Sequence, residues 1–129
     1  HGAPVDTSPH ITIGGLTKDT VILTEGALKA DVAAFLSKRK NVSWIGIAGV
    51  NNTGKLAETL KSVDVNTPLY EAFDMDKFEN ENVRKAMKKL QVLCEGEGFY
   101  MCQITWDKKF KGIDDALLNR RNKIWKTGF

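Results

Sequence analysis

Cysteine and histidine are scarce in this sequence. Its 129 residues include two cysteines, Cys94 and Cys102, and two histidines, which stand far from the cysteines along the chain. A structural zinc site takes four such ligands, and a disulfide framework takes several cysteine pairs, so the composition supports neither class of site. We expect both cysteines to be buried, reduced thiols.

Long apolar runs are missing as well. No stretch approaches the roughly 20 apolar residues that a transmembrane helix needs. The first residues, "HGAPVDTSPH", lack the basic and apolar regions of a secretory signal peptide. These absences predict a protein without a membrane partner and with a cytoplasmic location.

Positive charge is present only in small excess. The formal net charge of +3 permits contact with a polyanion but is far below that of a typical nucleic-acid-binding domain. The length and the 42% of hydrophobic residues fit one domain that can bury its own core. We place that domain at residues 20–129. Residues 1–19 are expected to be an N-terminal extension, or residues added for expression, in a piece of a longer protein.

What the sequence does contain is a regular alternation of apolar runs and helix-period segments. The predicted strands are 20–24, 42–49, 68–74 and 98–105. Helices are expected at 26–40, after Thr53 as a possible N-cap, after Asn80 or Asn82, and at 112–125. The first two strands are almost entirely apolar, which is typical of strands covered by helices on both faces. The pattern predicts an α/β fold with a four-stranded, mainly parallel sheet in the order 2-1-3-4.

Each predicted helix has an apolar stripe that we expect to face the sheet. The stripes comprise Leu28, Val32, Phe35 and Leu36 in the first helix, Leu56, Leu60 and Val63 in the second, Val83, Met87, Leu90 and Cys94 in the third, and Ile113, Leu117 and Ile124 in the last.

Acidic residues stand at the ends of two predicted strands. Glu25 follows the first strand, and Asp74 and Asp76 close the third. Open parallel sheets bind ligands beyond the carboxyl ends of their strands, and residues two apart on an extended segment point to the same side. With the order 2-1-3-4 the first and third strands are neighbours, so the three carboxylates are expected to converge.

Three converging carboxylates repel one another unless a cation neutralises them. Mg²⁺ prefers oxygen ligands and usually keeps several waters, so a few protein carboxylates plus a substrate phosphate make a suitable shell. The sequence therefore predicts a site for Mg²⁺, or Mn²⁺, on Glu25, Asp74 and Asp76. The alternative is that each acid is separately solvated on its loop.

Five short segments follow one another along the chain at the predicted strand ends and turns: "TEGALKAD", "GVNN", "AFDMD", "TWD" and "KGIDD". In their order and strand positions these segments resemble the Toprim domain of bacterial primases, topoisomerases, some nucleases and recombination proteins. They are most similar to Toprim-like domains of plasmid, phage and conjugative-element replication proteins. The resemblance implies a compact, Rossmann-like Toprim fold, acid–base chemistry or metal ligation by Glu25, and magnesium binding by Asp74 and Asp76.

Several basic and amide residues are candidates for contact with phosphate. Lys29 stands one helical turn after Glu25 and either pairs with that carboxylate or points at substrate phosphate; its place in the resembling segment favours phosphate. Lys111 is a second candidate, with a solvated lysine as the alternative. Asn51 and Asn52 lie in the turn that the resemblance places beside the site.

The segment "KGIDD" adds two more acids, Asp114 and Asp115. One of them either completes the acidic site or caps the last helix, whose first turn favours acids. The sequence leaves the two roles open.

A P-loop is the main competing motif. Gly49, Gly54 and Lys55 have its spacing, but the Ser or Thr that would ligate magnesium is replaced by Leu56. Because Leu56 also belongs to the apolar stripe of the second helix, we treat the match as coincidental and a P-loop NTPase as the least favoured function.

The resemblance implies primase-type, Mg²⁺-dependent nucleotidyl transfer within a larger mobile-element replication protein. The expected partners are DNA or primer RNA, nucleotides, and other domains of that protein. A Toprim nuclease is the second hypothesis. The third is a non-catalytic module that binds nucleic acid or a replication partner, with Lys38, Arg39, Lys40, Arg120 and Arg121 as phosphate contacts.

Overall fold

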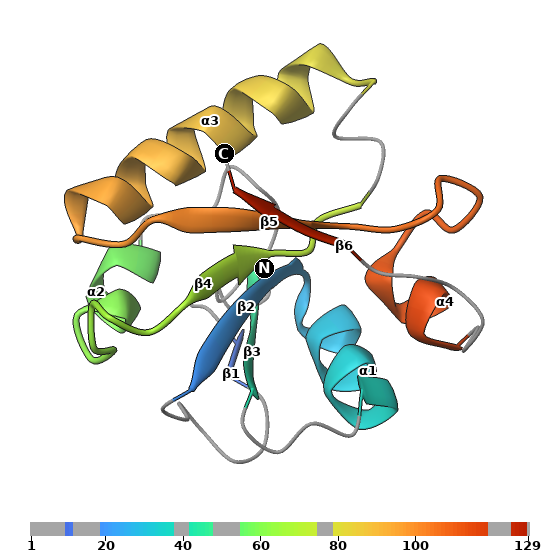
Figure 1. Cartoon of the computed structure of the whole chain (residues 1–129), viewed down its shortest axis with the longest axis horizontal. Helices are drawn as coiled ribbons and strands as arrows, with labels where there is room; N and C mark the ends of the chain where they lie inside the picture. The colour runs from blue at the N-terminus through green and yellow to red at the C-terminus, as the bar shows by residue number, and fades with distance from the viewer. Residues whose placement is uncertain are drawn as a thin grey trace, which may run out of the picture.

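A mixed sheet forms the centre of the domain in the computed structural model, which describes residues 10–11, 19–37, 42–47, 55–74, 79–118 and 125–128 (Figure 1). Its strands are β1 (His10–Ile11), β2 (Thr20–Glu25), β3 (Val42–Ile47), β4 (Leu69–Glu71), β5 (Met101–Thr105) and β6 (Trp125–Gly128). The helices are α1 (Ala27–Ser37), α2 (Leu56–Leu60), α3 (Glu81–Gly96) and α4 (Ile113–Leu118).

The strand order is β1-β3-β2-β4-β5-β6. The four inner strands pair in parallel, and they are the four predicted strands in the predicted order 2-1-3-4, so the Rossmann-like α/β fold is confirmed. The sheet also has an antiparallel strand at each edge, β1 and β6, which the sequence did not predict. The prediction that the last helix continues to residue 125 is wrong at its end, because Trp125 begins β6 and pairs with Thr105.

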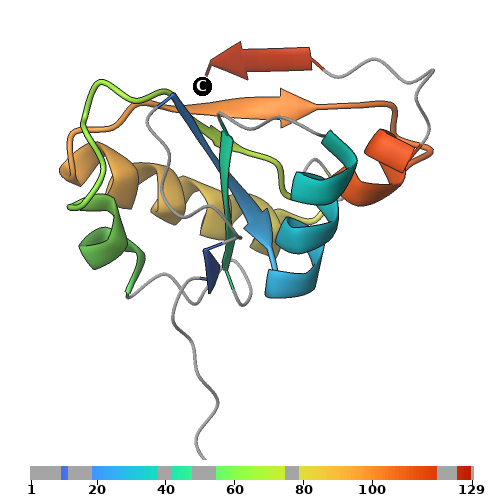
Figure 2. The ribbon, with the colours of Figure 1, turned by 90° about the horizontal axis from the view of Figure 1, so that it is seen from below.

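Two apolar cores lie on the two faces of the sheet. The first joins the sheet to α2 and α3 and includes Leu23, Leu60 and Leu90. The second joins the sheet to α1 and α4 and includes Trp44, Trp106 and Ile113. Figures 1 and 2 show α1 and α4 side by side, with α3 on the other side of the sheet. The parallel strands are thus covered on both faces, as their apolar sequences indicated.

The predicted stripe of α1 is wrong. Leu28 and Phe35 are 77% and 78% exposed, whereas Ala30 and Ala33 are fully buried. Val32 and Leu36 are only partly buried. Small side chains at the interface allow α1 to pack closely against the sheet and α4, and this close approach decides which face of the helix turns inward.

The other predicted stripes agree with the structure where it describes them. Leu56, Leu60 and Val63 are buried beside α2, and Met87, Leu90 and Cys94 are buried on α3, with Val83 packed against that core. In α4, Ile113 is buried and Leu117 is partly buried, while Ile124 lies outside the described residues.

Both cysteines are free thiols, as expected. Burial, and secondarily the charge of Glu95, raises the pKa of the Cys94 thiol to about 12, so this side chain behaves as a small apolar core residue. Cys102 is only half-buried, which differs from the expectation of full burial. None of the helices in the described ranges is long and apolar enough to cross a membrane.

Asn80 rather than Asn82 caps helix α3. Its side-chain oxygen accepts hydrogen bonds from the backbone N–H groups of Asn82, at 3.0 Å, and Val83, at 3.3 Å. We therefore expect Asn80→Ala to lower the free energy of unfolding by about 1 kcal/mol. Urea unfolding of Asn80→Ala and of the matched variant Asn82→Ala checks this. An equal loss in both variants would contradict the assignment of the cap.

Candidate functional site

The candidate site lies at the carboxyl ends of the neighbouring strands β2 and β4. Beyond the ladder itself, the N–H of Ala72 donates to the carbonyl of Leu23 at 2.8 Å, which holds the chain after β4 against β2. At the end of β2 the chain turns at Gly26, whose φ of +83° is a left-handed conformation that glycine adopts at little cost. Helix α1 begins at the next residue and brings Lys29 to the strand ends.

An ion pair between Lys29 and Asp74 is the centre of the site. Lys29 Nζ donates to Asp74 Oδ1 at 2.6 Å, and the two side chains are 21% and 10% exposed. The sequence offered Glu25 or a substrate phosphate as the partner of Lys29; in the structure its hydrogen bond goes to the acid at the end of the neighbouring strand. A charge-assisted hydrogen bond of this length is stronger than a neutral one.

Asp114 joins this pair from the first turn of α4. A Cβ atom added at Gly112 would overlap Asp114 Oδ1 and would lie 3.0 Å from Lys29 Nζ, so both side chains occupy the space that glycine leaves. Within the described part of the chain, Asp114 Oδ1 is buried without a hydrogen-bond partner. Asp115, by contrast, is exposed. Of the two acids that the sequence could not separate, Asp114 lies in the site.

Opposing effects act on the charge of Lys29. Burial lowers its pKa, but the hydrogen bond to Asp74 and the charges of Asp74, Asp114 and Glu25 together raise it above the ordinary value of 10.5. Lys29 is therefore a fixed ammonium ion at neutral pH. Glu25 contributes to the field at Lys29, as its position one helical turn earlier suggested.

Glu71 is a buried acid that the sequence did not mark as a site residue, and it fixes the backbone next to Asp74. Glu71, the last residue of β4, is fully buried, and its Oε2 accepts a hydrogen bond from the backbone N–H of Phe73 at 2.9 Å. This contact fixes the backbone immediately before Asp74. The signal in the sequence was an acid inside the otherwise apolar run "LYEAF", where an unpaired charge would be costly.

The remaining predicted residues are either exposed or outside the described ranges. Lys111 is exposed on the loop before Gly112. Asp76, Asn51 and Asn52 lie outside the described residues. The basic residues proposed for a non-catalytic module, Lys38, Arg39, Lys40, Arg120 and Arg121, also lie outside them.

The described residues contain no group of three or more His, Cys, Asp or Glu side chains arranged to hold a metal ion. Asp74 and Asp114 nevertheless supply carboxylate oxygens of the type that Mg²⁺ prefers, and the buried, unpartnered Asp114 Oδ1 suits a cation ligand. The donor set therefore fits magnesium, with Lys29 supplying the positive charge in the structure described here.

The P-loop alternative loses its central requirement. Leu56, at the place of the metal-binding hydroxyl, is fully buried in the core shared by the sheet, α2 and α3. It serves packing, as its place in the apolar stripe indicated.

Lys29→Met should lower the free energy of unfolding by about 1.5–3 kcal/mol at pH 7, because it removes the hydrogen bond between two charged groups. The pKa of Lys29 is raised by folding, so its stabilising effect is complete below pH 10.5 and is lost as the pH rises through the higher folded value. The difference between wild type and Lys29→Met should therefore shrink above pH 10.5 in urea unfolding. The matched variant Lys88→Met, on the exposed face of α3, should show a small difference at every pH. A constant difference for Lys29→Met would contradict the ion-pair assignment.

Gly112→Ala should separate Lys29 from Asp114, because the new methyl group takes their place. Overpacking of this kind costs typically about 1–3 kcal/mol. Gly96→Ala is the matched control, since nothing lies within 4 Å of a Cβ atom there, and it should be neutral or stabilising. Thermal unfolding of the two variants makes the comparison, and equal stability would show that Gly112 has no special role.

Residues 16–124 of the chain match the family of domains described as a domain of unknown function, DUF3854. This match covers most of the 129 residues and includes every described residue of the candidate site, from Glu25 to Asp114. No match was found among the curated proteins or among the solved structures.

Proposed function

The chain belongs to the DUF3854 family, and from the acidic site at its strand ends we propose that it is a Mg²⁺-dependent domain that processes nucleic acid. The observation that carries the proposal is the convergence of Asp74 and Asp114 on one lysine at the carboxyl ends of parallel strands. This edge is where open α/β sheets bind their ligands. The Toprim-like resemblance of the same segments supports primase-type nucleotidyl transfer in a cytoplasmic replication protein as the reaction.

In this proposal Asp74, Asp76 and Glu25 hold the metal, and Asp114 is an additional ligand. A metal held by these residues would supply positive charge that neutralises phosphate oxygens. Lys29 holds Asp74 in place and presents its ammonium group to an incoming phosphate. The alternative role for Glu25, at the end of β2, is that of the acid–base group of the reaction in place of metal ligation.

A non-catalytic binding module is the second candidate. It is favoured by one observation, that Lys29 already supplies a counter-charge to Asp74, so that the described acids are held together by a protein cation. In such a module the acidic cluster stabilises the packing of α1 and α4 on the sheet, and the domain contributes affinity for nucleic acid to a larger protein.

Metal titration separates the two candidates. At a Mg²⁺ or Mn²⁺ concentration ten times Kd, binding to the folded state alone adds about 1.4 kcal/mol to the free energy of unfolding. We expect this gain in the wild type and in Asp115→Asn, whose exposed carboxylate lies outside the site, and its loss in Asp74→Asn. Each variant is compared with its own metal-free state, since Asp74→Asn also removes the partner of Lys29.

The same proteins are then assayed for nucleotide incorporation and for strand cleavage. Turnover that needs metal and disappears in Asp74→Asn supports the enzyme. A metal response that survives in Asp74→Asn would remove this site, and a wild type that shows neither metal response nor turnover with DNA and nucleotides present would favour the binding module.

A further inference from the structure

The loop between β5 and α4, residues 106–111, carries a concentration of positive charge next to the site. Lys108, Lys109 and Lys111 are all exposed, and Asp107 is the one acid among these six residues. The loop begins at the carboxyl end of β5 and leads directly into Gly112 and Asp114. It is therefore on the same edge of the sheet as Lys29 and Asp74. We call residues 106–111 the lysine loop.

Hydrogen bonds within the lysine loop fix its backbone. The indole Nε1 of Trp106 donates to the carbonyl of Phe110 at 2.6 Å. The N–H of Phe110 donates to the carbonyl of Asp107 at 3.0 Å, and the N–H of Lys109 donates to Asp107 Oδ1 at 3.1 Å. Trp106 is 2% exposed, so the loop is anchored in the core between the sheet and α4. A ligand that binds here meets a backbone that is already ordered, which lowers the entropic cost of binding.

The ammonium groups of Lys108 and Lys109 have different neighbours. Lys108 Nζ lies 3.9 Å from Glu79 Oε1, while Lys109 Nζ lies 5.2 Å from the centre of the Phe110 ring. The Lys108–Glu79 pair is more than two-thirds exposed on both sides, and exposed ion pairs contribute little free energy. Both lysines can exchange these contacts for a stronger anion. Three exposed lysines within four successive residues can contact successive phosphates of a chain.

We propose that the lysine loop holds the phosphodiester backbone of a nucleic-acid strand and leads it to the Lys29–Asp74 site. This inference rests on the proposed function for the choice of nucleic acid as partner, since an acidic site that acts on phosphodiesters needs an adjoining contact for the strand. Lysine is a point charge that binds phosphate without a fixed approach direction, and so suits a contact that is independent of base sequence.

Binding of a fluorescent single-stranded oligonucleotide at a series of salt concentrations tests the proposal. It is measured by anisotropy in EDTA, so that metal binding plays no part. Each phosphate contact to a single strand contributes about 0.7 to the slope of log K against log salt. The variant K108Q/K109Q/K111Q should lower that slope by about 2 and weaken binding on the order of 100-fold at 0.1 M salt.

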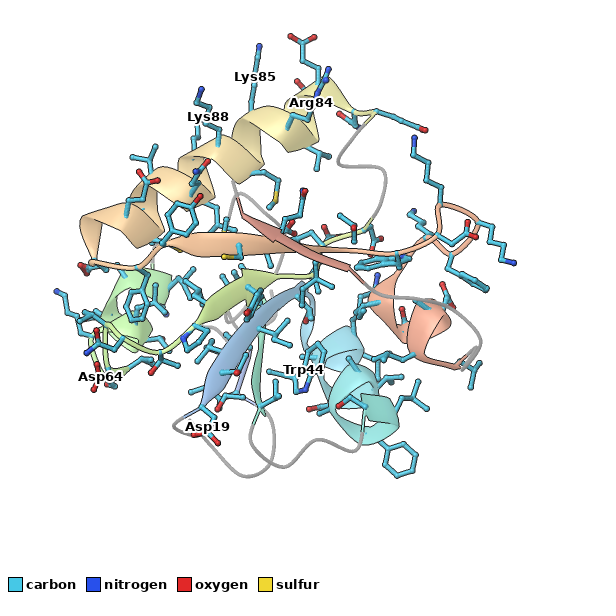
Figure 3. All side chains as sticks on the ribbon, in the orientation of Figure 1. Asp19, Trp44, Asp64, Arg84, Lys85 and Lys88 are labelled. Atoms are coloured by element: carbon cyan, nitrogen blue, oxygen red, sulfur yellow. The ribbon has the colours of Figure 1, made fainter. Side chains whose placement is uncertain are left out.

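Helix α3 offers a control with the same change in charge. Lys85, Lys88 and Lys89 are exposed, and Figure 3 shows Lys85 and Lys88 pointing away from the sheet. The variant K85Q/K88Q/K89Q should retain the wild-type slope within about one unit. A loop variant that binds like the wild type, or an equal loss in the α3 variant, would overturn the proposal, the latter because it would show a response to net charge alone.

Two further measurements separate the remaining explanations. Trp106→Phe keeps the aromatic ring in the core but removes the indole donor, so it should weaken binding with the slope unchanged, and unaltered binding would show that the fixed loop is irrelevant. Polyglutamate of the same charge should displace the oligonucleotide poorly; displacement at equal charge concentration would replace nucleic acid with an acidic protein as the partner.

Failure of the metal chemistry leaves a different pattern from failure of the loop. If Mg²⁺ binds elsewhere, or does not bind, the metal adds no Asp74-dependent stability, while the loop variant still binds the oligonucleotide in EDTA more weakly than the wild type. If only the loop assignment is wrong, metal binding depends on Asp74 while the loop variant binds normally.

Discussion

The hydrogen bond between Lys29 and Asp74 joins the two elements on which the rest of the site depends. It connects the first turn of α1 to the end of β4, and Asp114 adds the first turn of α4. Asp74 and Asp114 both lie beside Lys29, and their negative charges would repel each other without a cation there. The lysine therefore makes the packing of α1 and α4 compatible with an acidic strand edge, in the same way that a metal ion would.

The parallel sheet was predictable because its strands are short apolar runs separated by helix-period segments. The buried faces of α2 and α3 were also predictable, because the large apolar residues of these helices alternate with clearly polar ones. Helix α1 was not, since apolar residues lie on most of its circumference and periodicity does not choose a face. The structure selects the face with Ala30 and Ala33, which depends on how closely the helix approaches the sheet. Edge strand β6 depends on pairing with β5, which no local pattern records.

The candidate site shows the same division. Glu25 and Asp74 follow from the rule that ligands bind at strand ends, which needs only the strand order. The pairing of Lys29 with Asp74 joins two residues that are 45 positions apart in the sequence, and it depends on the reach of the long lysine side chain. The choice of Asp114 over Asp115 depends on the rotation of α4, and the role of Gly112 on the space between α1 and α4. These three features exist only in the folded packing.

The buried alanines of α1 also set the height of this helix above the sheet. Lys29 is the residue before Ala30, so its backbone rises or falls with that contact. A side chain larger than alanine at position 30 would lift the helix by a fraction of its own width and carry the ammonium group away from Asp74. The distance between the charges is thus determined by an apolar contact beneath them. In this domain the size of the side chain at position 30 therefore changes the strength of the Lys29–Asp74 ion pair, although neither charged residue is altered.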